Sequence, residues 1–202
     1  MSDSNEIEFL DQPFESIHQF HVDLNRVVLL NYGFALAEMT RAEQEDADRL
    51  ENELAHERFD HETAGQMRSK LFSDYEEYRQ AARQLALVGV VTRLQHWIGQ
   101  FVEGLPNRPQ KLVNSWLIKQ LEFLNRELGN GPFPLPFFED LVTVRDSIVH
   151  ADSRAKWNFE RNREVAARYQ NAFGKVELSE SQLQEAIDKA VGQVAWYDDR
   201  TP

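Results

Sequence analysis

Three residues that could take part in catalysis lie close together towards the C-terminal end of this chain: Arg145, Asp146 and His150. Residues four apart lie on one face of a helix, so the Asp146 carboxylate can hydrogen-bond the His150 imidazole, fix its tautomer and favour its charged form. Arg145 and His150 lie about 140° apart around the same helix. Only the long arginine side chain, or a surface shared with a partner, brings these two groups together.

The segment around these residues has the periodicity of a helix that is buried on two sides. At 100° per residue, one apolar stripe contains Phe137, Leu141, Val144 and Ile148. A neighbouring row contains Phe138, Val142, Arg145 and Val149. A polar row contains Glu139, Thr143, Asp146 and His150, and we consider Thr143 and Ser147 as further hydrogen-bond donors. Two adjacent apolar rows predict packing against more than one neighbour.

Apolar residues recur at threes and fours along most of the chain, which predicts an all-α fold. The expected helices span 14–41, 63–102, 110–128, 136–150, 152–173 and 179–196. From Met39 to Ala55 the sequence is acidic and rich in helix formers, which predicts a solvated, projecting helix or its tip. The first two helices should form a long antiparallel hairpin whose acidic tip, residues 38–75, projects into solvent. Residues 1–175 then form one helical domain, and 176–202 provide a C-terminal helix packed on the same domain. That last helix should begin with a capping box of Ser179 and Gln182.

The composition excludes several functional classes. A net charge of -12 argues against a nucleic-acid coat protein. The chain has no cysteine, which rules out disulfides, thiolate nucleophiles and cysteine-based metal sites. It has no apolar run of membrane-spanning length, and its first residues are acidic, so we expect a cytoplasmic protein without a membrane partner.

One segment is locally basic: residues 141–175 hold seven basic side chains against four acidic ones. Arg154, Lys156 and Arg161, with Trp157 among them, are candidates for phosphate contacts and base stacking on RNA. The alternative is a solvated helix whose arginines pair with the acidic hairpin.

The pattern Arg145-Asp146, three residues, His150 on a late apolar helix of an all-α chain resembles the signature of the HEPN superfamily (higher eukaryotes and prokaryotes nucleotide-binding). That signature is an Arg, four to six residues and a His, often with a polar residue after the Arg. Arg49 and His56 also fit the spacing, but they lie in the acidic segment, where no buried surface would hold a site. In architecture and length the chain resembles the ribonuclease-associated members of the superfamily.

The resemblance implies a metal-independent endoribonuclease that acts as a symmetric homodimer and needs no cofactor. His150 would then be the general base or acid, Arg145 would stabilise charge on the phosphate, and Asp146 would orient His150. The product would be a 2′,3′-cyclic phosphate. The partners implied are RNA, a second copy, and an antitoxin or other protein, in a toxin–antitoxin, defence or RNA-processing setting.

Two alternatives stay open from the sequence. One is a catalytically silent HEPN scaffold that binds RNA, nucleotide or a protein partner. The other is an unrelated helical-bundle interaction module whose working surface is the acidic hairpin, residues 38–75. Cleavage of RNA that depends on His150 separates the enzyme from both alternatives, and truncation of the hairpin separates the two alternatives from each other.

Overall fold

The computed structural model describes residues 17–57, 59–113, 115–150, 163–171 and 175–201, and within them the fold is all-α, as the periodicity predicts. The elements are α1 (Ile17–Leu24), the π-helical segment η1 (Asn25–Leu29), α2 (Leu30–His56), α3 (His61–Gly104), α4 (Leu117–Leu128), α5 (Leu135–His150), α6 (Arg163–Tyr169) and α7 (Glu180–Asp198). No helix among these residues is both long and apolar enough to cross a membrane.

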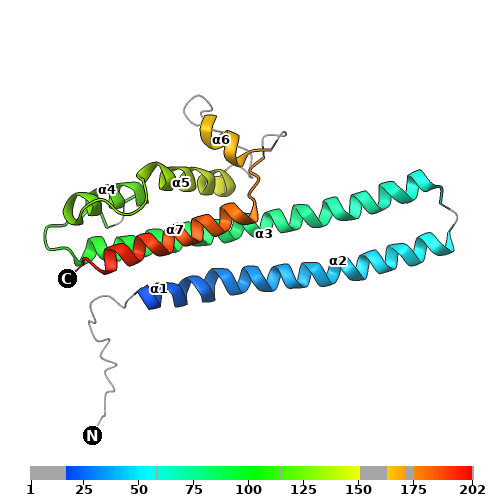
Figure 1. Cartoon of the computed structure of the whole chain (residues 1–202), viewed down its shortest axis with the longest axis horizontal. Helices are drawn as coiled ribbons and strands as arrows, with labels where there is room; N and C mark the ends of the chain where they lie inside the picture. The colour runs from blue at the N-terminus through cyan, green and yellow to red at the C-terminus, as the bar shows by residue number, and fades with distance from the viewer. Residues whose placement is uncertain (1–16, 58, 114, 151–162, 172–174, 202) are drawn as a thin grey trace, which may run out of the picture.

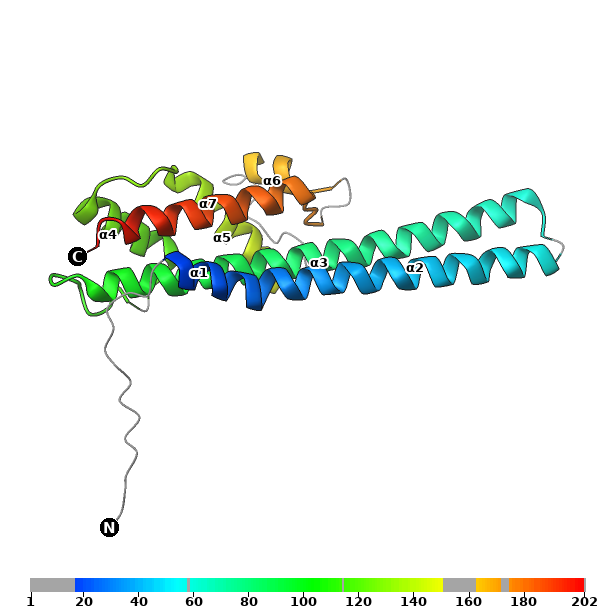
Figure 2. The same cartoon turned by 60° about the horizontal axis from the view of Figure 1, so that its bottom comes forward.

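Helix α3 is the element on which the others are assembled. It contacts α1, η1, α2, α4, α5 and α7. Figures 1 and 2 show α1, η1 and α2 as one continuous rod that runs antiparallel to α3, with the far part of this hairpin extending beyond the other helices. The predicted long antiparallel hairpin is therefore confirmed.

Burial along the hairpin is uneven, because only its core end has apolar residues on several sides. The C-terminal half of α3 contributes much of the core, including Leu87, Val90, Val91, Leu94, Ile98, Phe101 and Val102. No residue of α2 is buried. The predicted solvated tip is thus present, and the core lies where α1, α4, α5 and α7 surround α3.

Local sequence signals set several helix ends. The Asp60 side chain accepts a hydrogen bond from the Thr63 N–H at 2.7 Å and caps α3. At the start of α7, the Gln182 N–H donates to the Ser179 hydroxyl at 3.2 Å, and the Ser179 N–H donates to the Gln182 side chain at 2.8 Å. The predicted capping box is confirmed. Helix α4 ends at Leu128, and Gly129 follows it with a φ of 97°, a conformation that favours glycine.

Two predicted helix boundaries are wrong. The helix expected from 110 begins only at Leu117, because the Gln120 side chain donates to the Val113 carbonyl at 2.7 Å and stabilises a turn before the helix. Trp116, expected on the buried face, is consequently 61% exposed. The helix expected over 152–173 includes α6 but ends at Tyr169, because Gln170 forms an isolated antiparallel bridge with Val176.

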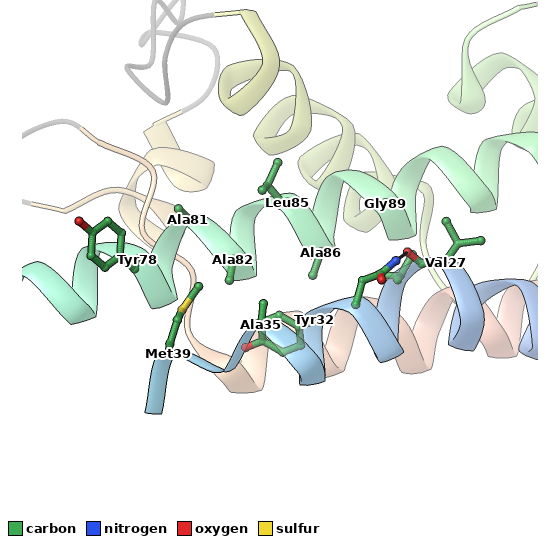
Figure 3. Close-up of a pocket in the computed structure, with 12 residues that line it drawn as sticks. Val27, Tyr32, Ala35, Met39, Tyr78, Ala81, Ala82, Leu85, Ala86 and Gly89 are labelled. Carbon is green, nitrogen blue, oxygen red and sulfur yellow. Dashed lines mark hydrogen bonds between the residues drawn. The ribbon is translucent and has the colours of Figure 1, made fainter. Parts of the chain in front are cut away.

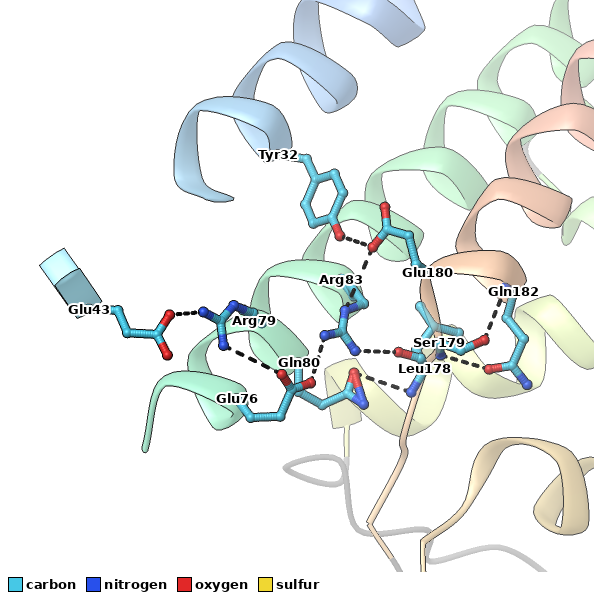
Figure 4. Close-up of polar contacts among 10 residues, drawn as sticks. All are labelled: Tyr32, Glu43, Glu76, Arg79, Gln80, Arg83, Leu178, Ser179, Glu180 and Gln182. Carbon is cyan, nitrogen blue, oxygen red and sulfur yellow. Dashed lines mark hydrogen bonds and ion pairs between the residues drawn. The ribbon is translucent and has the colours of Figure 1, made fainter. Parts of the chain in front are cut away.

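A chain of polar contacts joins the hairpin to the start of α7 (Figure 4). The Tyr32 hydroxyl donates to the Glu180 carboxylate at 2.5 Å. Arg83 donates to the Leu178 carbonyl at 3.0 Å and to Glu76 at 2.7 Å. These contacts tie α2, α3 and α7 together at the point where the hairpin leaves the core.

Candidate functional site

Helix α5 packs into the core through the apolar stripe that its sequence predicts. Leu141 and Val144 are 1% and 0% exposed, and Phe138 from the neighbouring row is also buried. Val149, expected to extend that second row, is instead 52% exposed. The C-terminal half of α5 is therefore covered on one side and exposed on the other. This half of the helix carries Arg145, Asp146 and His150.

Arg145 is held in place from two directions. Its Nε and Nη2 donate to the same oxygen of Asp146, Oδ1, at 2.9 and 2.7 Å. Its Nη1 donates to Oε1 of Gln95 on α3, at 3.2 Å. The guanidinium side chain is 14% exposed, so it lies at the edge of the core rather than free in solvent. A guanidinium has five N–H donors, and these contacts leave two of them for a ligand.

Asp146 contacts the arginine that precedes it. Its side chain is 39% exposed and its Oδ1 is engaged by Arg145. His150 is the last residue of α5, and its side chain lies outside the described residues. The structure thus brings Arg145 and Asp146 together, whereas the orientation of His150 by Asp146 stays a prediction.

Gln95 contacts the candidate site and is not predicted by the sequence. Its side chain accepts from Arg145 and also donates from Nε2 to the Ser115 carbonyl at 3.3 Å. It therefore joins α5 to α3 and to the turn before α4. No sequence motif identifies it, because its importance comes from the packing of α5 against α3.

The two other hydroxyls near the motif are used within α5 itself. Ser147 donates to the Thr143 carbonyl at 2.9 Å, and Thr143 donates to the Glu139 carbonyl at 2.5 Å. Such bonds to the preceding turn are common for Ser and Thr in helices. Ser147 is also buried, so we assign neither residue a role.

The predicted RNA-binding residues Arg154, Lys156, Trp157 and Arg161 lie outside the described residues. Of the basic segment beyond them, Arg168 on α6 forms an ion pair with Asp140 on α5. The alternative prediction paired the arginines of this segment with the acidic hairpin. Arg168 instead pairs with α5, to which Asp140 belongs. It helps to fasten α6 onto the helix that carries the motif.

A second feature lies on the hairpin, away from the motif. An apolar groove of about 350 Å³ runs between α2 and α3, and we call it the hairpin groove. Its lining residues are Val27, Val28, Asn31, Tyr32, Ala35, Met39, Tyr78, Ala81, Ala82, Leu85, Ala86 and Gly89. Figure 3 shows Ala82 and Ala86 directed towards α2, with Tyr78 and Met39 at one end and Val27 at the other.

The described residues contain no group of three or more His, Asp or Glu side chains arranged to hold a metal ion. In comparisons with protein-family models, curated proteins and solved structures, nothing matches this chain.

Proposed function

We propose that this chain is a HEPN-type, metal-independent endoribonuclease that acts as a homodimer, with Arg145, Asp146 and His150 as its site. The single observation that carries the proposal is the fixed guanidinium of Arg145. Asp146 and Gln95 hold it at the rim of the core, and its two remaining N–H donors suit a phosphate oxygen. An arginine fixed before the substrate arrives needs little reorganisation during the reaction.

The proposed reaction is attack of a ribose 2′-hydroxyl on the adjacent phosphorus. His150 accepts the proton from the 2′-oxygen, a bond forms from this oxygen to phosphorus, and the bond from phosphorus to the 5′-oxygen breaks. The leaving 5′-oxygen takes up a proton from a general acid. In the symmetric dimer this acid is the histidine of the second copy. The products are a 2′,3′-cyclic phosphate and a 5′-hydroxyl, and Arg145 stabilises the charge on the phosphate oxygens.

Cleavage of RNA in the presence of EDTA tests the proposal. We expect wild-type protein to cleave, and His150→Ala and Arg145→Ala each to lower the rate by about 100-fold or more. Arg49→Ala and His56→Ala, at the other pair with motif spacing, are the matched controls and should keep full activity. An active wild type whose rate survives both substitutions on α5 would remove this site.

Gln95 serves in this scheme as a positioning residue, because it contacts the guanidinium and not the substrate. We expect Gln95→Ala to lower kcat by about 10-fold with little change in KM, since it loosens the arginine without removing it. Gln95→Glu keeps an acceptor at this position and should retain more activity than Gln95→Ala. Equal losses in the two variants would contradict the positioning role.

A second candidate function is a protein-interaction module, and the hairpin is the observation that favours it. Residues 38–75 hold 11 acidic and five basic side chains, and no α2 residue is buried. A surface with this charge suits a basic partner. Capture of such a partner that is lost on hairpin truncation and indifferent to His150→Ala would favour this candidate over the enzyme.

A further inference from the structure

We propose that the hairpin groove binds the same groove of a second copy of this chain, so that two α2–α3 hairpins pack antiparallel as a four-helix bundle. The inference goes beyond the proposed function. It is argued from exposed apolar surface and from a carboxylate–imidazole pair, and it does not involve Arg145 or His150.

The first support is the amount of apolar surface around the groove. Of the residues that line the groove, the exposed large ones are Val27 (43%), Tyr78 (57%) and Leu85 (69%). Leu30 (58%) and Phe34 (70%) do not line it but continue the row of Val27 at helical spacing, so they border it on the same side. Together they present on the order of 600 Å², at the upper limit of what a monomer usually exposes in one patch. A stable dimer of standard size buries about 800 Å² on each copy, including its polar rim. The groove and the bordering row of Val27, Leu30 and Phe34 together therefore supply most of the area that such an interface needs.

The second support is that α3 carries two seams. One seam, Tyr75, Arg79, Ala82 and Ala86, faces α2, as shown by the Tyr75 contact with Asp46 at 2.7 Å and the Arg79 ion pair with Glu43. A second seam repeats the same spacing of threes and fours through Tyr78, Ala81, Leu85 and Val88. Helices with two such seams are typical of four-helix bundles, in which each helix touches two neighbours. Along the groove, α2 covers only the first.

The third support is a polar pairing, an imidazole N–H facing a carboxylate that can accept it, and it selects a second copy in antiparallel orientation. Asp74 and His96 are both exposed, and each lies eleven residues from Leu85 (85 − 74 and 96 − 85), close to three full turns and so on the same face. A two-fold axis at Leu85 places Asp74 opposite the partner's His96 at both ends of the pair. The same orientation keeps the two acidic tips, residues 38–75, far apart.

The inference is tested first by the mass in solution. Sedimentation from about 1 to about 100 µM should show a species of twice 23.6 kDa for wild-type protein. Leu85→Glu should raise the dimer dissociation constant by about 100-fold or more, because it places a charge in the apolar contact. Phe72→Glu is the matched control. Phe72 is 62% exposed on the same helix but does not line the groove, and thirteen residues of helix place it about 140° around the axis from Leu85, so its substitution should change nothing.

The antiparallel geometry has a sharper test, since the chain has no cysteine. At a two-fold axis a residue meets its own copy, so Leu85→Cys alone should form a disulfide-linked dimer on oxidation, whereas Phe72→Cys should not. Asp74→Lys should weaken the dimer, and His96→Asp added to it should restore the affinity.

A monomeric wild type would count against both proposals, because the ribonuclease also needs a second copy, whereas the Leu85 outcomes concern the groove alone. The inference is overturned if the wild-type protein stays a monomer at about 100 µM. It is overturned in the same way if the groove of that monomer instead binds a Lys/Arg-rich amphipathic peptide. A dimer that survives Leu85→Glu, or that does not cross-link through Leu85→Cys, overturns it as well. Arg145→Ala, which should abolish cleavage, should leave the dimer intact.

Discussion

The guanidinium of Arg145 takes its orientation from two neighbours, one adjacent in sequence and one fifty residues away. Asp146 engages two of its nitrogens, and Gln95 engages the third. The carboxylate also offsets part of the arginine's charge, so affinity for phosphate depends on the donors that are left and not on charge alone. Position on α5 by itself would not have fixed this side chain.

Tyr32 provides a residue-scale prediction of pH dependence. Burial, followed by the hydrogen bond to Glu180, raises the pKa of the Tyr32 hydroxyl to about 12. The folded protein therefore keeps this proton when an unfolded tyrosine, with a pKa near 10, has begun to lose it. The stabilising contribution is fully present below pH 10 and is lost as the pH rises from about 10 to about 12.

Absorbance of tyrosinate after rapid pH jumps measures this shift. The transition that Tyr32→Phe removes should be centred near 12 in wild-type protein, and Glu180→Gln should move it downwards because the acceptor loses its charge. A Tyr32 transition near 10 would contradict the contact that joins α2 to α7.

At the scale of elements, the hairpin depends on a close approach of α3 to η1. A Cβ atom built on Gly89 would lie 2.9 Å from Cγ2 of Val28, which is buried in the π-helical segment. Glycine at this point allows the two helices to approach each other and also forms part of the groove. A larger residue at 89 must push the helices apart or displace Val28.

Two glycine substitutions test this approach. A Cβ atom added to Gly33 of α2 would meet no neighbouring atom within 4 Å, so Gly33→Ala should stabilise the protein by about 0.5–1 kcal/mol through helix propensity. Gly89→Ala should instead cost about 1 kcal/mol net, since the clash with Val28 outweighs the same gain. Urea unfolding measures both, and equal stabilisation by the two substitutions would show that the helices are not in close contact there.

At the scale of the whole molecule, stability is concentrated at one end. The buried residues of α3 before Tyr75 include only Ala64, and none is found in α2. The distal hairpin is joined by exposed contacts such as the Arg68–Glu51 ion pair, whose side chains are 44% and 55% exposed. Exposed pairs of this kind contribute little to stability.

Shortening the hairpin by one heptad in each helix tests this distribution. Residues 47–53 and 66–72 lie opposite each other, as the Arg68–Glu51 pair shows, so removing both segments keeps the helical register. We expect the free energy of unfolding to fall by less than about 2 kcal/mol, with RNA cleavage retained. The same cut at 28–34 and 83–89 removes core residues and should prevent folding, which circular dichroism and thermal melts would report.

The sequence alone determined the all-α class, the long hairpin, the acidic tip and the capping box at Ser179, because periodicity, charge and caps are local properties. The sequence did not predict where α4 begins, because this depends on the hydrogen bond from the Gln120 side chain to the Val113 carbonyl. Arg145 and Asp146 were found from their spacing on one helix. Only the tertiary structure decided that Gln95 holds Arg145, that Val149 is exposed and that the hairpin carries an open apolar groove. These features arise where helices distant in sequence pack together, or leave a face without a neighbour.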